Sequence, residues 1–142
     1  MTTVKLSIHS ASTPAEVMRT LTDFSPARPA AWPSIDAEHF VVHERGASWA
    51  EVTEGTASAW ERARYDWNDD AGRVTVTTHE SKVFGPGGGW TFQLTPEPEG
   101  TRVDIELTRT PSTLGQRLLA ALLPLVGPAS FRKSFRQPLN AK

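Results

Sequence analysis

Hydrophobic and polar residues alternate strictly in two runs of the last third of the chain. Residues 90–94 read Trp-Thr-Phe-Gln-Leu and residues 103–107 read Val-Asp-Ile-Glu-Leu, with Pro96, Pro98 and Gly100 between them. A period of two places the large apolar side chains on one face of a strand and the polar ones on the other. The pattern therefore predicts an antiparallel hairpin with one apolar face, and that face needs an apolar cover.

The segment that follows supplies a candidate for this cover. Residues 113–126 contain six leucines, one arginine and no acidic residue, which predicts a helix lying across the hairpin. The segment contains Pro124 and is followed by Gly127 and Pro128, so the helix must kink or break there. Beyond the prolines, apolar residues with a spacing of four predict a second helical stretch that still packs on the sheet: Phe131, Phe135 and Leu139.

The first two thirds of the chain read as one strand, two short helical elements and more strands. Alternation in residues 4–8 predicts the first strand, and Thr13-Pro-Ala-Glu16 has the form of a capping box that begins a helix. Three prolines around Trp32 limit the next stretch to turns or a short helix. Turn residues then separate strands at about 38–45, 48–54, 58–67, 73–83, 89–95 and 102–109, which short links make antiparallel neighbours.

The whole-chain composition narrows the function classes. The 142 residues suit a single domain, 1–142, and the absence of cysteine excludes disulfides and thiolate chemistry. A net charge of −1 argues against a general nucleic-acid binder. Residues 1–5 lack a signal-peptide pattern and residues 118–126 are too few for stable membrane insertion, so we expect a soluble, cytoplasmic protein. The cluster of Arg132, Lys133 and Arg136 is a solvated helix face or a contact for an acidic partner or membrane surface.

Specific residues connect this pattern to a known superfamily. The matching positions are Ile8, Pro14-Ala-Glu-Val17, Leu21, Asp23-Phe24, Trp32, Gly89-Trp-Thr-Phe92, Leu94, Gly100-Thr-Arg-Val103 and Phe135-Arg-Gln-Pro-Leu139. Over essentially its whole length the chain resembles the START-like, or SRPBCC, superfamily of polyketide cyclases, dehydrases and lipid-transfer proteins. The resemblance implies an α+β helix-grip fold: a curved antiparallel sheet of about seven strands around a long, proline-kinked C-terminal helix, with two short helical elements after the first strand. It also implies a cavity that binds a small hydrophobic or aromatic ligand.

Charged residues in phase with the apolar face of a strand are the candidates for chemistry in such a cavity. Glu61 is in phase with Ala63 and Tyr65, Glu80 follows the phase of Val74 and Val76, and Arg109 follows that of Leu107. One interpretation is that each side chain reaches solvent at the strand end, or that Arg109 pairs with a glutamate. The other is that a glutamate acts as general acid/base while Arg109 stabilises negative charge and Tyr65 donates to a ligand oxygen, as in a cyclase or dehydratase.

Three functions stay open at this point: binding alone, cofactor-independent catalysis, or an interaction module that uses the helix face around Arg132 to Arg136. Because inward aromatic and aliphatic residues either pack the core or form a ligand wall, the candidate ligand-binding residues are Trp32, Trp67, Trp90, Phe92, Thr78, Leu107, Leu118 and Leu122. We expect no metal site, because the histidines lack partners at ligand spacing, and no cofactor, because no cofactor fingerprint is present. An exposed strand edge leaves monomer and homodimer both open.

Overall fold

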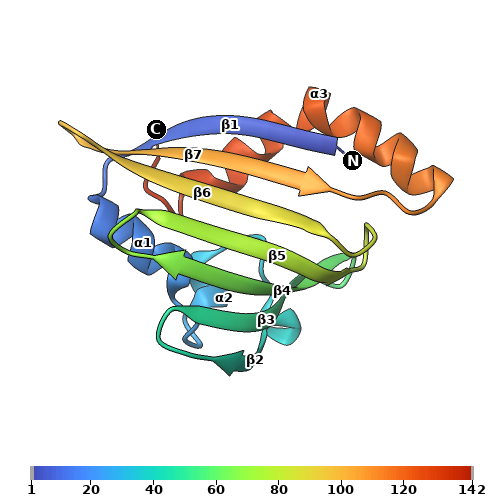
Figure 1. The fold of residues 1–142 in the computed structure, drawn as a ribbon, viewed down its shortest axis with the longest axis horizontal. Coiled ribbons are helices and arrows are strands. Elements are labelled where there is room, and N and C mark those ends of the chain that lie inside the picture. The colour runs from blue at the N-terminus through green and yellow to red at the C-terminus, as the bar shows by residue number, and fades with distance from the viewer. Residues whose placement is uncertain (1, 142) are drawn as a thin grey trace.

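The computed structural model describes residues 2–141. Its elements follow in the order β1 (Thr2–Ser10), α1 (Pro14–Thr22), α2 (Arg28–Ala31), the 3₁₀ helix η1 (Ala37–His39), β2 (Val41–Arg45), β3 (Trp49–Thr56), β4 (Ala59–Asn68), β5 (Arg73–Ser81), β6 (Gly88–Glu97), β7 (Gly100–Arg109) and α3 (Leu114–Arg136). The strands form one sheet in the order β1-β7-β6-β5-β4-β3-β2, and every neighbouring pair is antiparallel. The predicted helix-grip architecture is confirmed (Figure 1).

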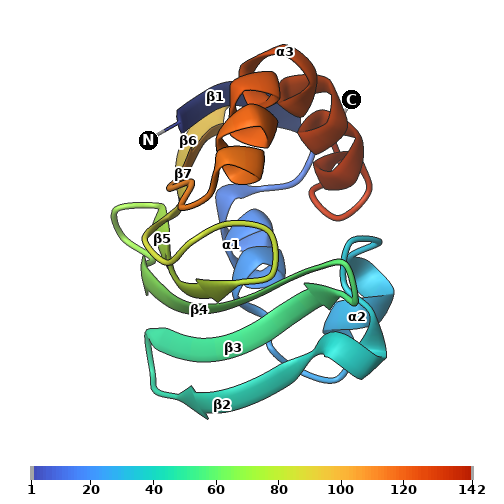
Figure 2. The ribbon, with the colours of Figure 1, turned by 90° about the vertical axis from the view of Figure 1, so that its right-hand side faces the viewer.

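Alternation along the strands puts the core on the concave face of the sheet. The alternating β1 residues Val4, Leu6 and Ile8 are buried, and across the β1–β7 pair they lie opposite Leu107, Ile105 and Val103. The sheet curves around α1, with α3 at its β1 end and α2 at its β3 end (Figure 2). The apolar face is thus enclosed from within the curve rather than by a second sheet.

The capping box predicted for the first helix is present at the start of α1. The Thr13 hydroxyl accepts a hydrogen bond from the Glu16 amide, and the Glu16 carboxylate accepts one from the Thr13 amide. These bonds satisfy two backbone donors that the first turn of a helix leaves unpaired. Val17, Met18 and Leu21 are buried on the inner side of the helix.

The C-terminal helix carries the predicted kink. Helix α3 runs continuously from Leu114 to Arg136 through Pro124 and Pro128, so of the two predicted outcomes, a kink or a break, the structure has the kink. The ribbon bends in its middle in both views (Figures 1 and 2), as expected where proline removes a backbone donor. The second half packs on the core through Phe131 and Phe135, followed by Leu139.

The leucine-rich first half of α3 does not cover the sheet as predicted. Its large apolar side chains are mostly exposed, and only Ala120 is buried before Pro124. Periodicity alone located the apolar residues of α3 correctly but did not show which half of the helix meets the core.

The strand predicted at residues 38–45 begins later than expected, because residues 37–39 form η1 and β2 starts at Val41.

Candidate functional site

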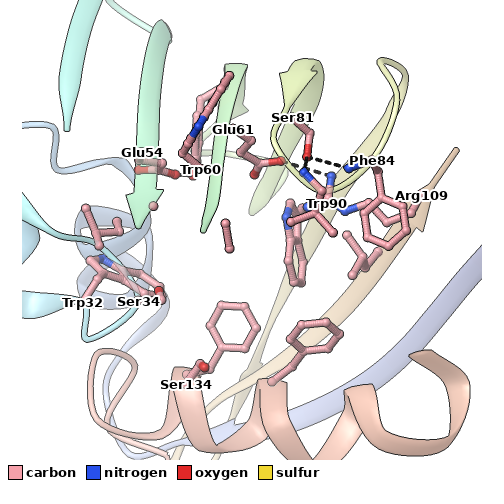
Figure 3. Close-up of a pocket in the computed structure, with 18 of the residues that line it drawn as sticks. Trp32, Ser34, Glu54, Trp60, Glu61, Ser81, Phe84, Trp90, Arg109 and Ser134 are labelled. Carbon is pink, nitrogen blue, oxygen red and sulfur yellow. Dashed lines mark hydrogen bonds and ion pairs between the residues drawn. The ribbon is translucent and has the colours of Figure 1, made fainter. Parts of the chain in front are cut away.

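A cavity of about 370 Å³ lies between the concave face of the sheet and α3. Strands β3 to β7, the segment around α2 and the middle and second half of α3 contribute its lining (Figure 3). Its volume falls at the lower end of the range typical of pockets for small molecules. The cavity therefore has room for a small molecule between the sheet and the helix.

Aromatic rings form the wall where α3 faces the sheet. The ring centroids of Trp90 and Phe92 are 6.0 Å apart at an interplanar angle of 14°, so the two rings stack along β6. Phe131 meets Trp90 edge to face at 5.2 Å, and Phe135 meets Trp90, Phe92 and Trp32 in the same way at 5.6, 5.8 and 5.8 Å. Such a wall offers flat faces and hydrogen-bearing edges to an aromatic ligand.

The first polar cluster of the cavity consists of Glu61, Thr78 and Arg109. Arg109 Nη1 lies 3.0 Å from Glu61 Oε2 and donates to Thr78 Oγ1 at 2.9 Å, while the Thr78 hydroxyl donates to Glu61 Oε2 at 3.1 Å. The Arg109 guanidinium also lies 5.7 Å from the centre of the Trp90 ring. Glu61 Oε1, by contrast, makes no hydrogen bond to any residue from 2 to 141. One carboxylate oxygen of the cluster is thus without a hydrogen-bond partner among residues 2–141.

The second cluster consists of Arg28, Glu54 and Tyr65, all three of them buried. Arg28 Nε donates to Glu54 Oε2 at 2.8 Å, Arg28 Nη2 donates to Tyr65 Oη at 3.2 Å, and the Tyr65 hydroxyl donates to Glu54 Oε1. Burial and the neighbouring Glu54 charge raise the pKa of Tyr65 well above its ordinary value. Burial opposes the charge on Arg28, yet the oxygens of Tyr65 and Glu54 raise the pKa of Arg28 above its ordinary value. Tyr65 is therefore a neutral hydrogen-bond donor and Arg28 a fixed cation.

The two clusters are neighbours because Glu54 of β3 lies directly opposite Glu61 of β4 in the sheet. Both side chains point into the same space, and Glu61 lies between Glu54 and Arg109 (Figure 3). Two carboxylates and two guanidinium groups thus line the cavity together, which makes the charges of the lining cancel. A neutral ligand meets no net charge there, whereas an ionised ligand has to compete with a partner already in place.

The structure places most of the candidate residues predicted from sequence in the cavity lining. These are Glu61, Tyr65, Arg109, Trp32, Trp90, Phe92 and Leu107. Thr78 is not part of the lining but makes hydrogen bonds to Glu61 and Arg109, while the ring centroids of Trp67 and Phe24 are 6.0 Å apart. The structure thus places residues of β6, of β7 and the distant Trp32 around one cavity.

Three further residues predicted from sequence lie outside the cavity lining and are exposed. Glu80 is exposed, because a bulge between the pairs Arg62–Glu80 and Ala63–Thr78 reverses the phase of β5 and turns Ser81 inward instead. Leu118 and Leu122 are also exposed, because α3 turns its neighbouring Leu119 and Leu123 toward the cavity.

Sequence reasoning missed Arg28 and Glu54. Glu54 continues the alternation of the buried Ala50 and Val52, so the signal was present once the inward face of β3 is known. Arg28 has no such signal, because it lies in a proline-rich segment without periodicity. No group of three or more His, Asp or Glu that could hold a metal ion lies together among residues 2–141.

Solved structures of other proteins share this architecture over nearly the whole chain. No family model matches the chain, and no curated protein matches it by sequence. TTHA0849 from Thermus thermophilus has a TM-score of 0.71 at 19% identity, covering 97% of this chain and 92% of its own. The ZhuI aromatase/cyclase from a Streptomyces species has a TM-score of 0.64 at 12% identity, covering 92% and 94%. A START superfamily protein from Mycobacterium smegmatis has a TM-score of 0.60 at 13% identity, covering 96% and 99%.

The chain has the START-like fold. In this chain Glu61, Arg109 and the aromatic wall line the cavity between the curved sheet and the long helix. Identities of 12–19% establish this fold and leave the chemistry to the residues of this chain.

Proposed function

We propose that the protein binds a small, uncharged aromatic molecule in the cavity between its sheet and α3. The observation that carries the proposal is a cavity of about 370 Å³ whose lining combines an aromatic wall with charges that cancel in pairs. Apolar burial and ring contacts supply affinity, while the paired charges disfavour an ionised ligand.

The Glu61 cluster indicates which polar group such a ligand carries. Glu61 Oε1 is a hydrogen-bond acceptor that has no partner among residues 2–141, and Arg109 uses only Nη1 in its contacts with Glu61 and Thr78. An acceptor next to unused donors suits a hydroxyl group beside a carbonyl, or a phenol. The structural neighbours support the proposal, because they include an aromatase/cyclase and a START superfamily protein.

The first test is native mass spectrometry of the protein purified from its own host, because a bound small molecule at one-to-one stoichiometry reveals the chemical class directly. The second is a titration with three probes that share one ring system: naphthol, naphthalene and naphthoate, followed by tryptophan fluorescence. We expect naphthol to bind most tightly. The Glu61→Gln variant should weaken naphthol binding roughly tenfold and change naphthalene binding little, because one hydrogen bond to a charged group is lost.

A space-filling variant with a matched control tests whether the probes occupy this cavity. Ser134 points from α3 into the cavity (Figure 3), whereas Ser130 lies exposed one turn earlier on the same helix. Ser134→Trp should abolish binding of all three probes, and Ser130→Trp should leave it unchanged. Equal binding by Ser134→Trp and the parent protein would show that the probes bind elsewhere, and the proposal would be wrong.

One observation favours a second candidate function, cofactor-independent acid/base catalysis. Glu61 pairs with Arg109 through Oε2 and keeps Oε1 without a partner among residues 2–141, so one carboxylate can take a proton from carbon next to a carbonyl while a cation stands near it. Glu61 would accept that proton while Arg109 stabilises the enolate oxygen. The enolate carbon would attack a second carbonyl of the same molecule, and the alkoxide so formed would take the proton back from Glu61. Glu61 would then remove a second proton from the attacking carbon as the hydroxyl leaves, which forms a C=C bond and releases the proton and the hydroxide as water. Tyr65 has no part in this first proton transfer. Its hydroxyl is neutral, accepts a hydrogen bond from Arg28 and already donates its proton to Glu54.

Hydrogen exchange on an aryl ketone separates the two functions. Tetralone in deuterated water is followed by NMR with the parent protein and with Glu61→Gln. Catalysis predicts exchange next to the carbonyl that is faster than in buffer and slowed about a hundredfold or more in Glu61→Gln. Exchange at the rate of buffer alone would remove the catalytic function and leave the binding function standing.

A further inference from the structure

The first half of α3 exposes a continuous apolar surface to solvent. The side chains that form it, here called the leucine face, are 42–78% exposed: Leu114, Leu118, Leu119, Leu122, Leu125 and Val126. In the most apolar 18-residue window of the helix only 11% of the residues are buried. Monomeric soluble proteins rarely leave so large a patch of leucine uncovered, so the leucine face indicates a partner.

The side chains of the leucine face share one side of the helix. At 3.6 residues per turn they fall within an arc of about 140°. The same helical positions continue past the prolines at Arg132, Lys133 and Arg136, all three exposed. One side of α3 is therefore apolar in its first half and basic in its second, and the chain contains no acidic residue after Glu106.

This distribution of charge favours an anionic lipid surface over a second copy of the chain. A bilayer rich in acidic lipids accepts leucine side chains below its headgroups and attracts Lys and Arg at the headgroup level. A second copy meeting the same face would bring cations against a surface with no carboxylate on α3 to pair them. The bilayer satisfies both halves of the helix at once.

The anchored second half limits how deeply α3 can enter a bilayer. Phe135 and Leu139 belong to the core, so only the residues from Leu114 to about Val126 are available. Thirteen residues at 1.5 Å per residue extend about 20 Å, less than the roughly 30 Å hydrocarbon thickness. The helix is therefore suited to lie on the membrane surface rather than to span it.

We propose that the leucine face, together with Arg132, Lys133 and Arg136, docks the protein peripherally on an anionic phospholipid bilayer. Leu119 belongs to the leucine face and also lines the cavity, so docking places the cavity beside the lipid. Docking itself does not depend on what the cavity binds. Passage of an apolar ligand between bilayer and cavity does rest on the proposed function.

Flotation with large vesicles tests the docking. One set contains equal parts of phosphatidylcholine and phosphatidylglycerol, and the other contains phosphatidylcholine alone. We expect the parent protein to float with the anionic vesicles and to bind the neutral ones at least tenfold more weakly. Two double variants, Leu118→Gln with Leu122→Gln and Lys133→Glu with Arg136→Glu, should each lower partitioning into anionic vesicles about tenfold or more.

Matched controls show whether a loss of vesicle binding is specific to α3 or follows from any change of an exposed apolar or charged residue. Val41→Gln removes an apolar side chain that is 49% exposed outside α3, and Arg73→Glu reverses an exposed charge on β5. Both should partition as the parent does, and circular dichroism shows whether each variant is folded. Naphthol titration of the same variants checks the cavity separately, so a failure of docking and a failure of ligand binding give different results.

Three results would overturn the proposal. The parent protein would fail to float with anionic vesicles, or the two leucine substitutions would leave flotation unchanged. Alternatively, light scattering would show a dimer that becomes a monomer in Leu118→Gln with Leu122→Gln, with no vesicle binding by the parent. The last result would assign the leucine face to a second copy of the chain.

Discussion

Removal of the Arg28 side chain tests whether the buried cluster at the cavity holds the fold together. The side chains of Arg28 and Glu54 are only 3% and 9% exposed, and their Nε–Oε2 distance is 2.8 Å. Arg28 Nη1 also donates to the backbone oxygens of Leu21 and Asp23 at 3.2 and 3.0 Å. The Arg28→Met variant therefore leaves a buried carboxylate without its cation and two carbonyls without their side-chain donor.

The burial of the Arg28–Glu54 pair sets the expected loss in the free energy of unfolding. Removing one partner of a buried ion pair costs about 3–5 kcal/mol, because the remaining charge stays desolvated. For a domain of this length such a loss lowers the melting temperature by roughly 10–15 °C. The Arg102–Asp104 pair serves as a control, because its side chains are 52% and 39% exposed at a distance of 3.0 Å. Arg102→Met should cost less than about 1 kcal/mol.

Urea unfolding monitored by circular dichroism gives both free energies of unfolding, and a double variant adds an internal check. In Arg28→Met with Glu54→Met no uncompensated charge stays buried, so the double variant should be more stable than Arg28→Met alone. The reasoning would be refuted if Arg28→Met and Arg102→Met were equally stable. It would also be refuted if the second substitution simply added to the loss.

Three further outcomes are expected. Tyr65 is the only tyrosine, and its raised pKa means that the unfolded chain releases this proton first. The contribution of Tyr65 to stability should therefore be constant below about pH 10 and fall as the pH rises further, and tyrosinate absorbance during an alkaline titration measures this directly. Thr13→Ala should cost about 1 kcal/mol in thermal unfolding, and because hydrogen bonds from Thr13 lower the pKa of Glu16, the contribution of this cap should disappear as the pH falls through that lowered value. Gly89→Ala should cost more than about 2 kcal/mol in urea unfolding, because φ is +145° and a Cβ would lie 1.7 Å from the Val76 oxygen; a variant as stable as the parent would contradict the β5–β6 geometry.

Local patterns predicted the secondary structure well where one physical rule dominates. The β6–β7 hairpin follows from strict alternation, and the start of α1 follows from the capping box. Prediction was incomplete where distant contacts decide the outcome. The two prolines indicated a kink or a break in α3, and the helix continues through Pro124 and Pro128 with a bend while its second half packs on the core.

In the candidate site, too, some residues could be predicted from local patterns and others depend on contacts between distant segments. Alternation correctly placed Glu61 and Arg109 on the inner face, because each strand keeps its phase up to that residue. The bulge after Thr78 turned Glu80 outward, and a bulge depends on the pairing between strands rather than on the sequence of one strand. Arg28 became part of the site only because the segment between α1 and β2 folds back against β3.

The amino-acid sequence by itself determined the periodic features of this protein: which strands have an inner face, where the first helix begins, and that the last helix is rich in leucine and basic residues. These follow from interactions between residues close together in the chain. Only the tertiary structure decided which half of α3 covers the cavity, that Glu54 and Glu61 lie side by side, and that the leucine face remains in solvent. Those arrangements depend on contacts between distant segments, whose geometry is set by how the whole sheet curves.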